Sequence, residues 1–303
     1  MEDAEGEVAL LALPYGGKVA VDQLEVMTGG GATNVAVAAA RMGLKAACLC
    51  RVGRDGPGQR IVEELEGFGV GTELVQYTDD FRSGYSVLLT DYAGERTILV
   101  HRGATCHLAV DRACLDRLAQ TKWLYVGSLR GPAAQLFFDL ADFADEHGIK
   151  LAVNPGATQL ALGVQGLAPV LARTELIVLN KDEAYELTGV EPDRSHTDEQ
   201  AMLRMLREAG CRMVVITEGE EGADGYDGEA FYSVPAFETQ VVSTVGAGDS
   251  FGAGCLTALH RGLPLADAIK IGAVNAARVV TQVGAKHGLL TWEEATALVA
   301  EQG

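Results

Sequence analysis

Positive charge is scarce in this 303-residue sequence, which has 24 Lys and Arg against 42 Asp and Glu and a net charge of −18. The basic residues form no cluster. This argues against nucleic-acid binding, because neutralising a phosphate backbone requires clustered Lys and Arg. An anionic ligand must therefore be held by local groups and not by the overall charge of the chain.

Other signals are also missing. The six cysteines form no CxxC pair and no zinc-site spacing with histidine, so we interpret them as buried thiols in a reducing compartment. No basic and apolar leader opens the sequence, and the longest uncharged stretch, residues 151–172, is interrupted by Pro155 and Pro169. These absences predict a cytoplasmic protein with no secretory signal and no membrane contact.

Short apolar runs alternate with amphipathic helical patterns through most of the chain. The predicted strands are residues 46–52, 123–127, 150–153, 176–179 and 212–217, and the predicted helices include 58–68, 132–146, 181–187 and 199–209. This alternation is typical of an α/β protein in which helices cover both faces of a mostly parallel sheet.

Two regions break this alternation. Residues 85–90 and 96–102 alternate apolar and polar side chains around a Gly-containing turn at 91–95, which predicts a β-hairpin. Residues 18–26 also look extended. We expect these segments to form a small second sheet, a lid that excludes water from a site.

Glycine is abundant, at 37 of 303 residues, and its first concentration is Gly29-Gly30-Gly31 before Asn34 and an apolar helix at 35–42. Glycine at a helix start allows the backbone to approach a ligand closely, and the free amides of the first turn attract anions or hydroxyl oxygens. The segment lacks the Gly-Lys-Ser/Thr of a Walker A loop. It is either a ligand site or a flexible turn in which Asn34 caps the helix.

The second concentration, Gly246-Ala247-Gly248-Asp249, precedes another apolar helix. A carboxylate beside the amides of a helix start fits phosphoryl transfer, because it removes the proton from the attacking hydroxyl while the amides stabilise the phosphoryl charge. The alternative is an Asp that only caps the helix. Phe251 stands where a dinucleotide-binding fingerprint needs glycine, so we reject a nicotinamide cofactor.

Two weaker patterns follow predicted strands. After one of them comes Thr217 with Gly219 and Gly222, which would hold nucleotide phosphates or form an ordinary turn. Asn180 and Glu183 stand three apart at a helix start. They suit a hydrated Mg²⁺ that bridges phosphates, or the capping box of the helix.

In this order the four patterns resemble the ribokinase-like carbohydrate kinase family, also called the PfkB family, over residues 13–298. The resemblance also rests on residues 94–97 and 102–104 and on Gly254. It implies an ATP-dependent kinase that uses Mg²⁺ to phosphorylate a hydroxyl group of a sugar or sugar derivative. It also implies a single domain over residues 1–303, a three-layer α/β/α sandwich with a mostly parallel central sheet and a lid from about 13–28 and 83–104. A homodimer formed through that lid is expected as well.

The resemblance further implies roles for matching positions. Asp249 would be the catalytic base, and the anion hole would consist of the amides of Gly246, Ala247 and Gly248. The phosphoryl acceptor would meet Gly29, Gly30, Asn34 and Arg102. The nucleotide would contact Asn180, Glu183, Thr217, Gly219, Gly222, Asn275 and Gly288, with Glu183 holding Mg²⁺ through water. Residues 284–288 look like the family's adenine-side wall.

Two features depart from the family pattern. Ser243 stands where an Asp commonly helps to hold a monovalent cation, and because a neutral hydroxyl is a poorer cation ligand, activation by K⁺ is in question. The family also opens with an apolar strand that ends in a substrate-binding Asp, whereas the run at residues 7–12 has no Asp after it. Either this run replaces that strand or the sheet lacks an element. Asp22 is not accepted as a substitute, because it falls in the expected lid.

Two other functions stay open. One is a nucleoside kinase of the same fold, and the other is a catalytically silent kinase-fold protein that binds a ligand or partner. The missing N-terminal Asp favours the silent protein, whereas the intact Gly-Ala-Gly-Asp run favours an enzyme. Nothing in the sequence identifies the acceptor.

Overall fold

The central element of the protein is a six-stranded sheet, seen in a computed structural model that describes residues 11–90, 96–192 and 198–302. The strand order is β10-β9-β8-β7-β6-β5. Its strands are β5 (Trp123–Val126), β6 (Lys150–Val153), β7 (Thr174–Asn180), β8 (Met213–Thr217), β9 (Ala223–Tyr226) and β10 (Phe231–Val234). The pairs from β5 to β8 are parallel, and β9 and β10 join antiparallel. The predicted mostly parallel sheet is confirmed.

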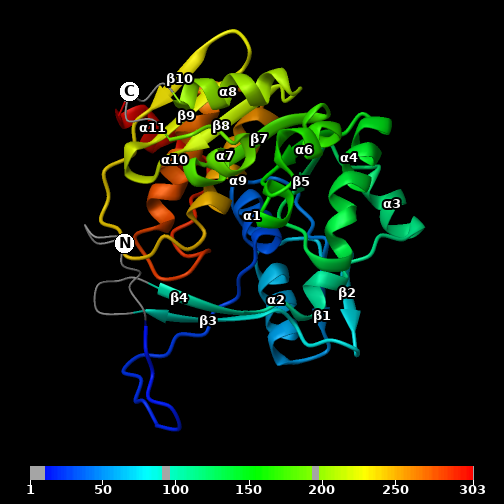
Figure 1. The fold of residues 1–303 in the computed structure, drawn as a ribbon, viewed down its shortest axis with the longest axis vertical. Helices are drawn as coiled ribbons and strands as arrows, with labels where there is room; N and C mark the ends of the chain where they lie inside the picture. The colour runs from blue at the N-terminus through cyan, green and yellow to red at the C-terminus, as the bar shows by residue number, and fades with distance from the viewer. Residues whose placement is uncertain (1–10, 91–95, 193–197, 303) are drawn as a thin grey trace.

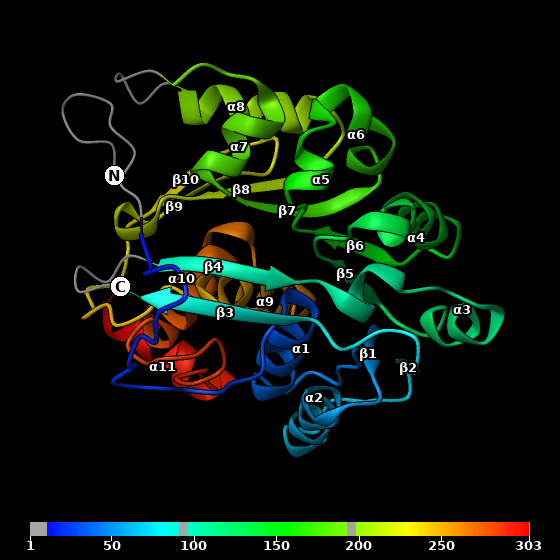
Figure 2. The ribbon, with the colours of Figure 1, turned by 60° about the horizontal axis from the view of Figure 1, so that its bottom comes forward.

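Helices cover both faces of this sheet (Figures 1 and 2). One layer contains α4 (Leu136–Glu146), α5 (Ala157–Leu160), α6 (Gly163–Leu171), α7 (Lys181–Thr188) and α8 (Asp198–Glu208). The opposite layer contains α1 (Gly31–Arg41), α9 (Ala247–His260), α10 (Leu265–Val279) and α11 (Trp292–Gln302). Along β7, Ile177 and Leu179 point into the core of the first layer, and Leu176 and Val178 into that of the second. This alternation makes a three-layer sandwich, as expected.

A smaller pair of strands stands apart from the main sheet. β1 (Cys50–Gly53) and β2 (Val75–Thr78) are parallel, and an isolated bridge joins Ala47 to Gly71. Around them lie α2 (Gly56–Gly67), α3 (Arg112–Leu118) and the short 3-10 helices η1 (Gly103–His107) and η2 (Gly131–Gln135); a third, η3 (Gly219–Glu221), follows β8. The strand predicted at 46–52 is thus regular only over its last part.

Within the described ranges no strand precedes β1. Residues 11 and 12 are exposed and in no strand, and residues 7–10 of the run considered as a first strand lie outside the described residues. Among the described residues the six-stranded sheet therefore ends at β5, whose first three residues are only half-buried.

The expected hairpin is present as β3 (Tyr85–Thr90) and β4 (Arg96–His101), which pair antiparallel. Its predicted turn at 91–95 lies outside the described residues. Residues 18–26 are exposed and form no strand, so the second sheet consists of β3 and β4, and the prediction of a further strand there was wrong.

All six cysteines are free; four are buried, as the sequence indicated, whereas Cys50 and Cys106 are only half-buried. None of the helices that the structure describes is both long and apolar enough to cross a lipid bilayer.

Candidate active site

Two helices that each have a glycine N-cap lie side by side, α1 and α9. Their N-cap residues, Gly30 and Gly246, have φ angles of 108° and 83°, which residues with a Cβ rarely adopt. A Cβ on Gly246 would lie 2.5 Å from the Cβ of Ala285, so this helix start tolerates only glycine. Since glycine has no capping side chain, first-turn amides of α9 remain for a ligand. The Ala247 amide is an exception, because it donates to the Thr244 carbonyl at 3.3 Å.

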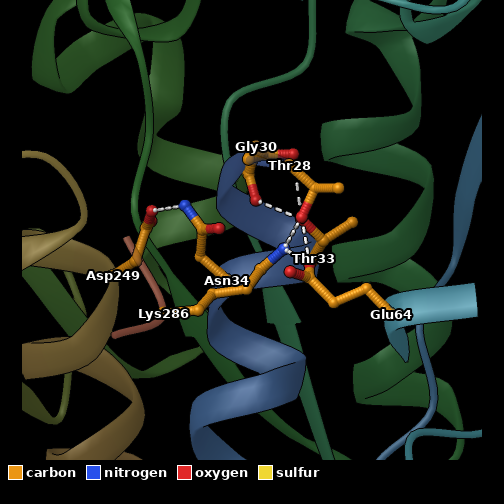
Figure 3. Close-up of polar contacts among 8 residues, drawn as sticks. Thr28, Gly30, Thr33, Asn34, Glu64, Asp249 and Lys286 are labelled. Carbon is orange, nitrogen blue, oxygen red and sulfur yellow. Dashed lines mark hydrogen bonds and ion pairs between the residues drawn. The ribbon is translucent and has the colours of Figure 1, made fainter. Parts of the chain in front are cut away.

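Asn34 and Asp249 connect these two helix starts. The Asn34 Nδ2 donates to the Asp249 Oδ2 at 2.7 Å (Figure 3). Asn34 is 5% exposed, and its Oδ1 is buried with no hydrogen-bond partner in the described part of the chain. Neither side chain therefore acts only as a helix cap, which was the alternative role that the sequence allowed for each. The Oδ1 is thus a buried acceptor that folding leaves without a donor.

Burial raises the pKa of the Asp249 carboxyl, and the hydrogen bond from Asn34 and the charge of Lys286 offset this only in part. Tyr125 of β5 lies close to this carboxyl. Its hydroxyl is buried without a partner among the described residues and fits against Gly252 of α9, where a Cβ would approach to 2.7 Å. Burial, followed by the charge of Asp249, raises the pKa of Tyr125. Asp249 is thus a half-buried carboxylate with a raised pKa, a condition that strengthens a general base.

An open cleft of about 2900 Å³ lies beside this pair and is bounded by the β3–β4 hairpin. The predicted acceptor residues all line it together with the start of α9: Gly29, Gly30, Asn34, Arg102, Gly246 and Asp249. Arg102 is exposed at the base of the hairpin, where η1 begins. Asp22 is also exposed and lines the cleft. The residues that the sequence assigned to the acceptor side thus border one large cleft, and contact with an acceptor stays a prediction for them.

A second hollow of about 390 Å³ lies at the carboxyl ends of β7 and β8, where Asn180 pairs in register with Thr217. Asn180, Thr217 and Gly219 line it. Asn180 and Glu183 form the capping box that the sequence offered as the alternative: the Asn180 Oδ1 accepts from the Glu183 amide at 2.8 Å, and the Glu183 Oε2 from the Asn180 amide at 2.9 Å. This box fixes the Glu183 carboxylate at the start of α7.

The pKa of Glu183 is raised, first by burial and then by neighbouring carboxylates that include Asp249. The negative charges of Glu183 and Asp249 thus repel each other. A divalent cation between the two hollows would relieve this repulsion, so the residues present fit a hydrated Mg²⁺. In the part of the chain described, no group of three or more His, Cys, Asp or Glu is arranged to bind a metal by itself. The remaining ligands would be water and phosphate.

Four predicted nucleotide residues lie outside both hollows: Glu183, Gly222, Asn275 and Gly288. Gly222 and Gly288 have positive φ angles and touch backbone carbonyls, at 2.1 Å and 2.4 Å from an added Cβ. Asn275 is fully buried and bonds through both ends of its amide, to the Ser250 carbonyl at 2.9 Å and the Leu290 amide at 3.1 Å. Their observed contacts hold the fold, and nucleotide contact stays a prediction for them.

The sequence did not indicate the role of Lys286, which it placed only within the adenine-side wall. The Lys286 ammonium group donates to the hydroxyl of Thr28 at 2.6 Å and to the carboxylate of Glu64 at 2.5 Å (Figure 3). One lysine between glycines carries no pattern, and Glu64 belongs to a helix rich in surface glutamates. No periodicity could have joined residues so far apart in the chain.

Solved structures of kinases share this architecture. The structure of Arabidopsis thaliana ribokinase complexed with ribose and ATP has a TM-score of 0.85 at 20% identity, covering 94% of this chain and 91% of that one. Burkholderia thailandensis nucleoside kinase in complex with inosine has a TM-score of 0.79 at 21% identity, covering 95% and 92%. At these identities the likeness concerns the fold, which is that of the ribokinases.

The sequence comparisons define the class. Haemophilus influenzae ribokinase is 28% identical over 294 residues, which cover 94% of this chain and 92% of that protein. The pfkB family carbohydrate kinase model matches residues 3–292, and the chain therefore belongs to the pfkB family. Its activity class is that of an ATP-dependent carbohydrate kinase.

Proposed function

We propose that this kinase transfers the terminal phosphoryl group of ATP to a hydroxyl group of a sugar or sugar derivative, with Asp249 as the general base. The observation that carries this proposal is the hydrogen bond between Asn34 and Asp249, which joins the two glycine-initiated helices at one point of the cleft. A base has to lie within hydrogen-bond reach of the hydroxyl it deprotonates, and this point is open to the cleft that the lid hairpin borders.

In this mechanism the acceptor lies over the turn at Gly29 and Gly30. One of its hydroxyl groups donates to the unpartnered Oδ1 of Asn34, and the attacking hydroxyl transfers its proton to Asp249. First-turn amides of α9 and the positive end of the helix stabilise the negative charge that develops on the phosphoryl oxygens. Because positioning and charge stabilisation dominate phosphoryl transfer, the reaction needs no covalent intermediate with the protein.

The nucleotide would occupy the hollow at the ends of β7 and β8, with Thr217 and Gly219 against its phosphates. Mg²⁺ would supply positive charge that bridges these phosphates, held through water by Glu183. Asn180 would orient that carboxylate through the capping box. These local groups would allow a chain with a net charge of −18 to hold a polyanion.

The acceptor class is tested by measuring ADP release over a panel of sugars, sugar acids and nucleosides, in parallel buffers containing K⁺ or Na⁺. We expect turnover with a sugar, and because Ser243 is a neutral ligand, we expect the two cations to support it within about twofold of each other. Asp249→Asn should lower kcat by about 100- to 10,000-fold. A preference for a nucleoside would favour the nucleoside kinase, and retention of most of the rate by the variant would remove Asp249 as the base.

A catalytically silent protein would bind a ligand but turn over no acceptor. The resemblance in fold to a nucleotide-bound ribokinase favours nucleotide binding here, and ATP with Mg²⁺ should then raise the melting temperature. Turnover of no compound in the panel, with this shift present, would favour a silent binding protein.

A further inference from the structure

A buried ion pair ties three distant segments together beside the proposed acceptor turn. Thr28 immediately precedes Gly29 and Gly30, Glu64 belongs to α2, and Lys286 belongs to the segment between α10 and α11. Lys286 bonds to both of the others, and the Thr28 hydroxyl donates to the same Oε2 of Glu64 that accepts from Lys286. The three polar groups form a closed ring, which we call the Thr28–Glu64–Lys286 tie (Figure 3).

The segment that carries Lys286 touches both sides of the site. Gly284 packs against Met27, whose Sδ would lie 2.5 Å from an added Cβ, and Ala285 packs against Gly246 at the start of α9. Movement of this segment would therefore shift the acceptor turn and the proposed anion hole together. The tie anchors the segment to α2 through Glu64. The side chain of Glu64 lines neither hollow.

Stability is a poor explanation for such a tie. The Lys286 side chain is 5% exposed and that of Glu64 is 31% exposed. Burying a lysine costs free energy that an ion pair only roughly repays, and an apolar pair of the same shape is often as stable. What an apolar pair could not supply is a fixed positive charge and a bond to the Thr28 hydroxyl.

We propose that Lys286 is a positioning residue for the kinase reaction, which holds the Thr28–Gly30 turn in place through the tie. The inference rests on the function proposed above. The positive charge of Lys286 lowers the pKa of Asp249, although burial raises it by more. The other groups that face Asp249 are Asn34, Tyr125 and Glu183, and the thiols of Cys48 and Cys50 also lie near the ammonium group.

The test compares Lys286→Met, Glu64→Gln and the double variant with the wild type. Glu64→Gln leaves the buried charge of Lys286 unpaired, and Lys286→Met leaves the half-buried charge of Glu64 unpaired. Each single variant should therefore lower the melting temperature, and the double variant should recover most of that loss. If Lys286 positions the turn, kcat/KM for the acceptor should stay about 10- to 100-fold low in the double variant, while KM for ATP changes less than about twofold. The acid limb of its kcat–pH profile should also move to higher pH, because Asp249 has lost the charge that lowered its pKa.

The pair Asp267 and Lys270, exposed on α10, supplies a matched control. Asp267→Asn with Lys270→Met removes the same two charges and should change neither the kinetics nor the pH profile. Recovery of both melting temperature and acceptor kcat/KM by the Lys286 and Glu64 double variant would overturn the inference, because the tie would then be structural only. A wild type that releases ADP with no acceptor would overturn the proposed function instead, and this inference with it.

Discussion

At the scale of single residues, the site is built on a carboxylate that folding places unfavourably. Burial raises the pKa of Asp249, and the bond from Asn34 and the charge of Lys286 recover only part of the cost of keeping it ionised. A group whose pKa is higher in the folded than in the unfolded chain lowers stability once the pH is high enough to ionise it. Asp249 therefore favours the proposed reaction at the expense of stability.

Asp249→Asn should for this reason raise the melting temperature at pH 8 while removing turnover. The gain should shrink as the pH falls through the raised pKa, because the wild-type carboxyl is then protonated and neutral like the amide. Thermal unfolding of both proteins between pH 4 and 8 measures the difference. A variant that melts below the wild type at pH 8 would mean that the bond from Asn34 outweighs the cost of burial.

At the scale of elements, the starts of α1 and α9 decide where the site can form. Both need a glycine with positive φ, and at Gly246 close packing against Ala285 adds a second reason. Helix propensity alone would disfavour so many small residues, and the sequence near 246–254 contains four glycines. Their effect is to bring backbone amides, Asp249 and the neighbouring helix into contact.

Gly246→Ala should therefore lower the free energy of unfolding by at least about 1–3 kcal/mol and lower kcat by about 100-fold, because it both strains the N-cap and displaces the segment at Ala285. Denaturant unfolding and steady-state kinetics measure the two effects.

Gly262→Ala is the matched control at the opposite end of the same helix. Gly262 has a φ of 85° but no atom within 4 Å of an added Cβ, so its substitution imposes the backbone strain without the clash. We expect a loss of stability of about 1 kcal/mol and an unchanged kcat. An equal loss of activity in both variants would point to general destabilisation.

At the scale of the whole molecule, the β3–β4 hairpin is a two-stranded sheet with apolar residues left uncovered. Val87 and Leu99 on one face of the ribbon, and Leu88, Ile98 and Val100 on the other, are between 42% and 55% exposed. A two-stranded ribbon is at most marginally stable by itself, and an apolar sheet surface of this kind favours pairing with another copy. We propose that the lid mediates a homodimer.

Sedimentation should then give twice the mass of one chain, and Leu99→Lys, which introduces a charge on the uncovered surface, should reduce it to the monomer. Leu162→Lys is the control, because Leu162 is 48% exposed next to α6, in the layer away from the lid. A wild type that sediments as a monomer at micromolar concentration would exclude this dimer.

The sequence alone determined most of the fold, because its information lies in local patterns. The alternating apolar runs predicted the parallel strands and covering helices, and the alternation at 85–90 and 96–102 predicted the hairpin. Residues 18–26 were misjudged, because an extended pattern becomes a strand only when a neighbour accepts its hydrogen bonds. The capping box at Asn180 and Glu183 was foreseen only as one of two options, since the same residues suit a cap and a cation.

Amino-acid order was enough to identify the glycine runs and Asp249, since these depend on residue types at short spacing, and the enzyme class followed from the resemblance of the four patterns together to the PfkB family. Only the tertiary structure decided that Asn34 reaches Asp249 across 215 positions and that Lys286 reaches Thr28 across 258. It also decided that the side-chain amide of Asn275 forms hydrogen bonds with the backbone of neighbouring segments. Such contacts join parts of the chain whose separation carries no periodic signal, so they arise only when the layers pack and bring buried polar groups within reach of a partner.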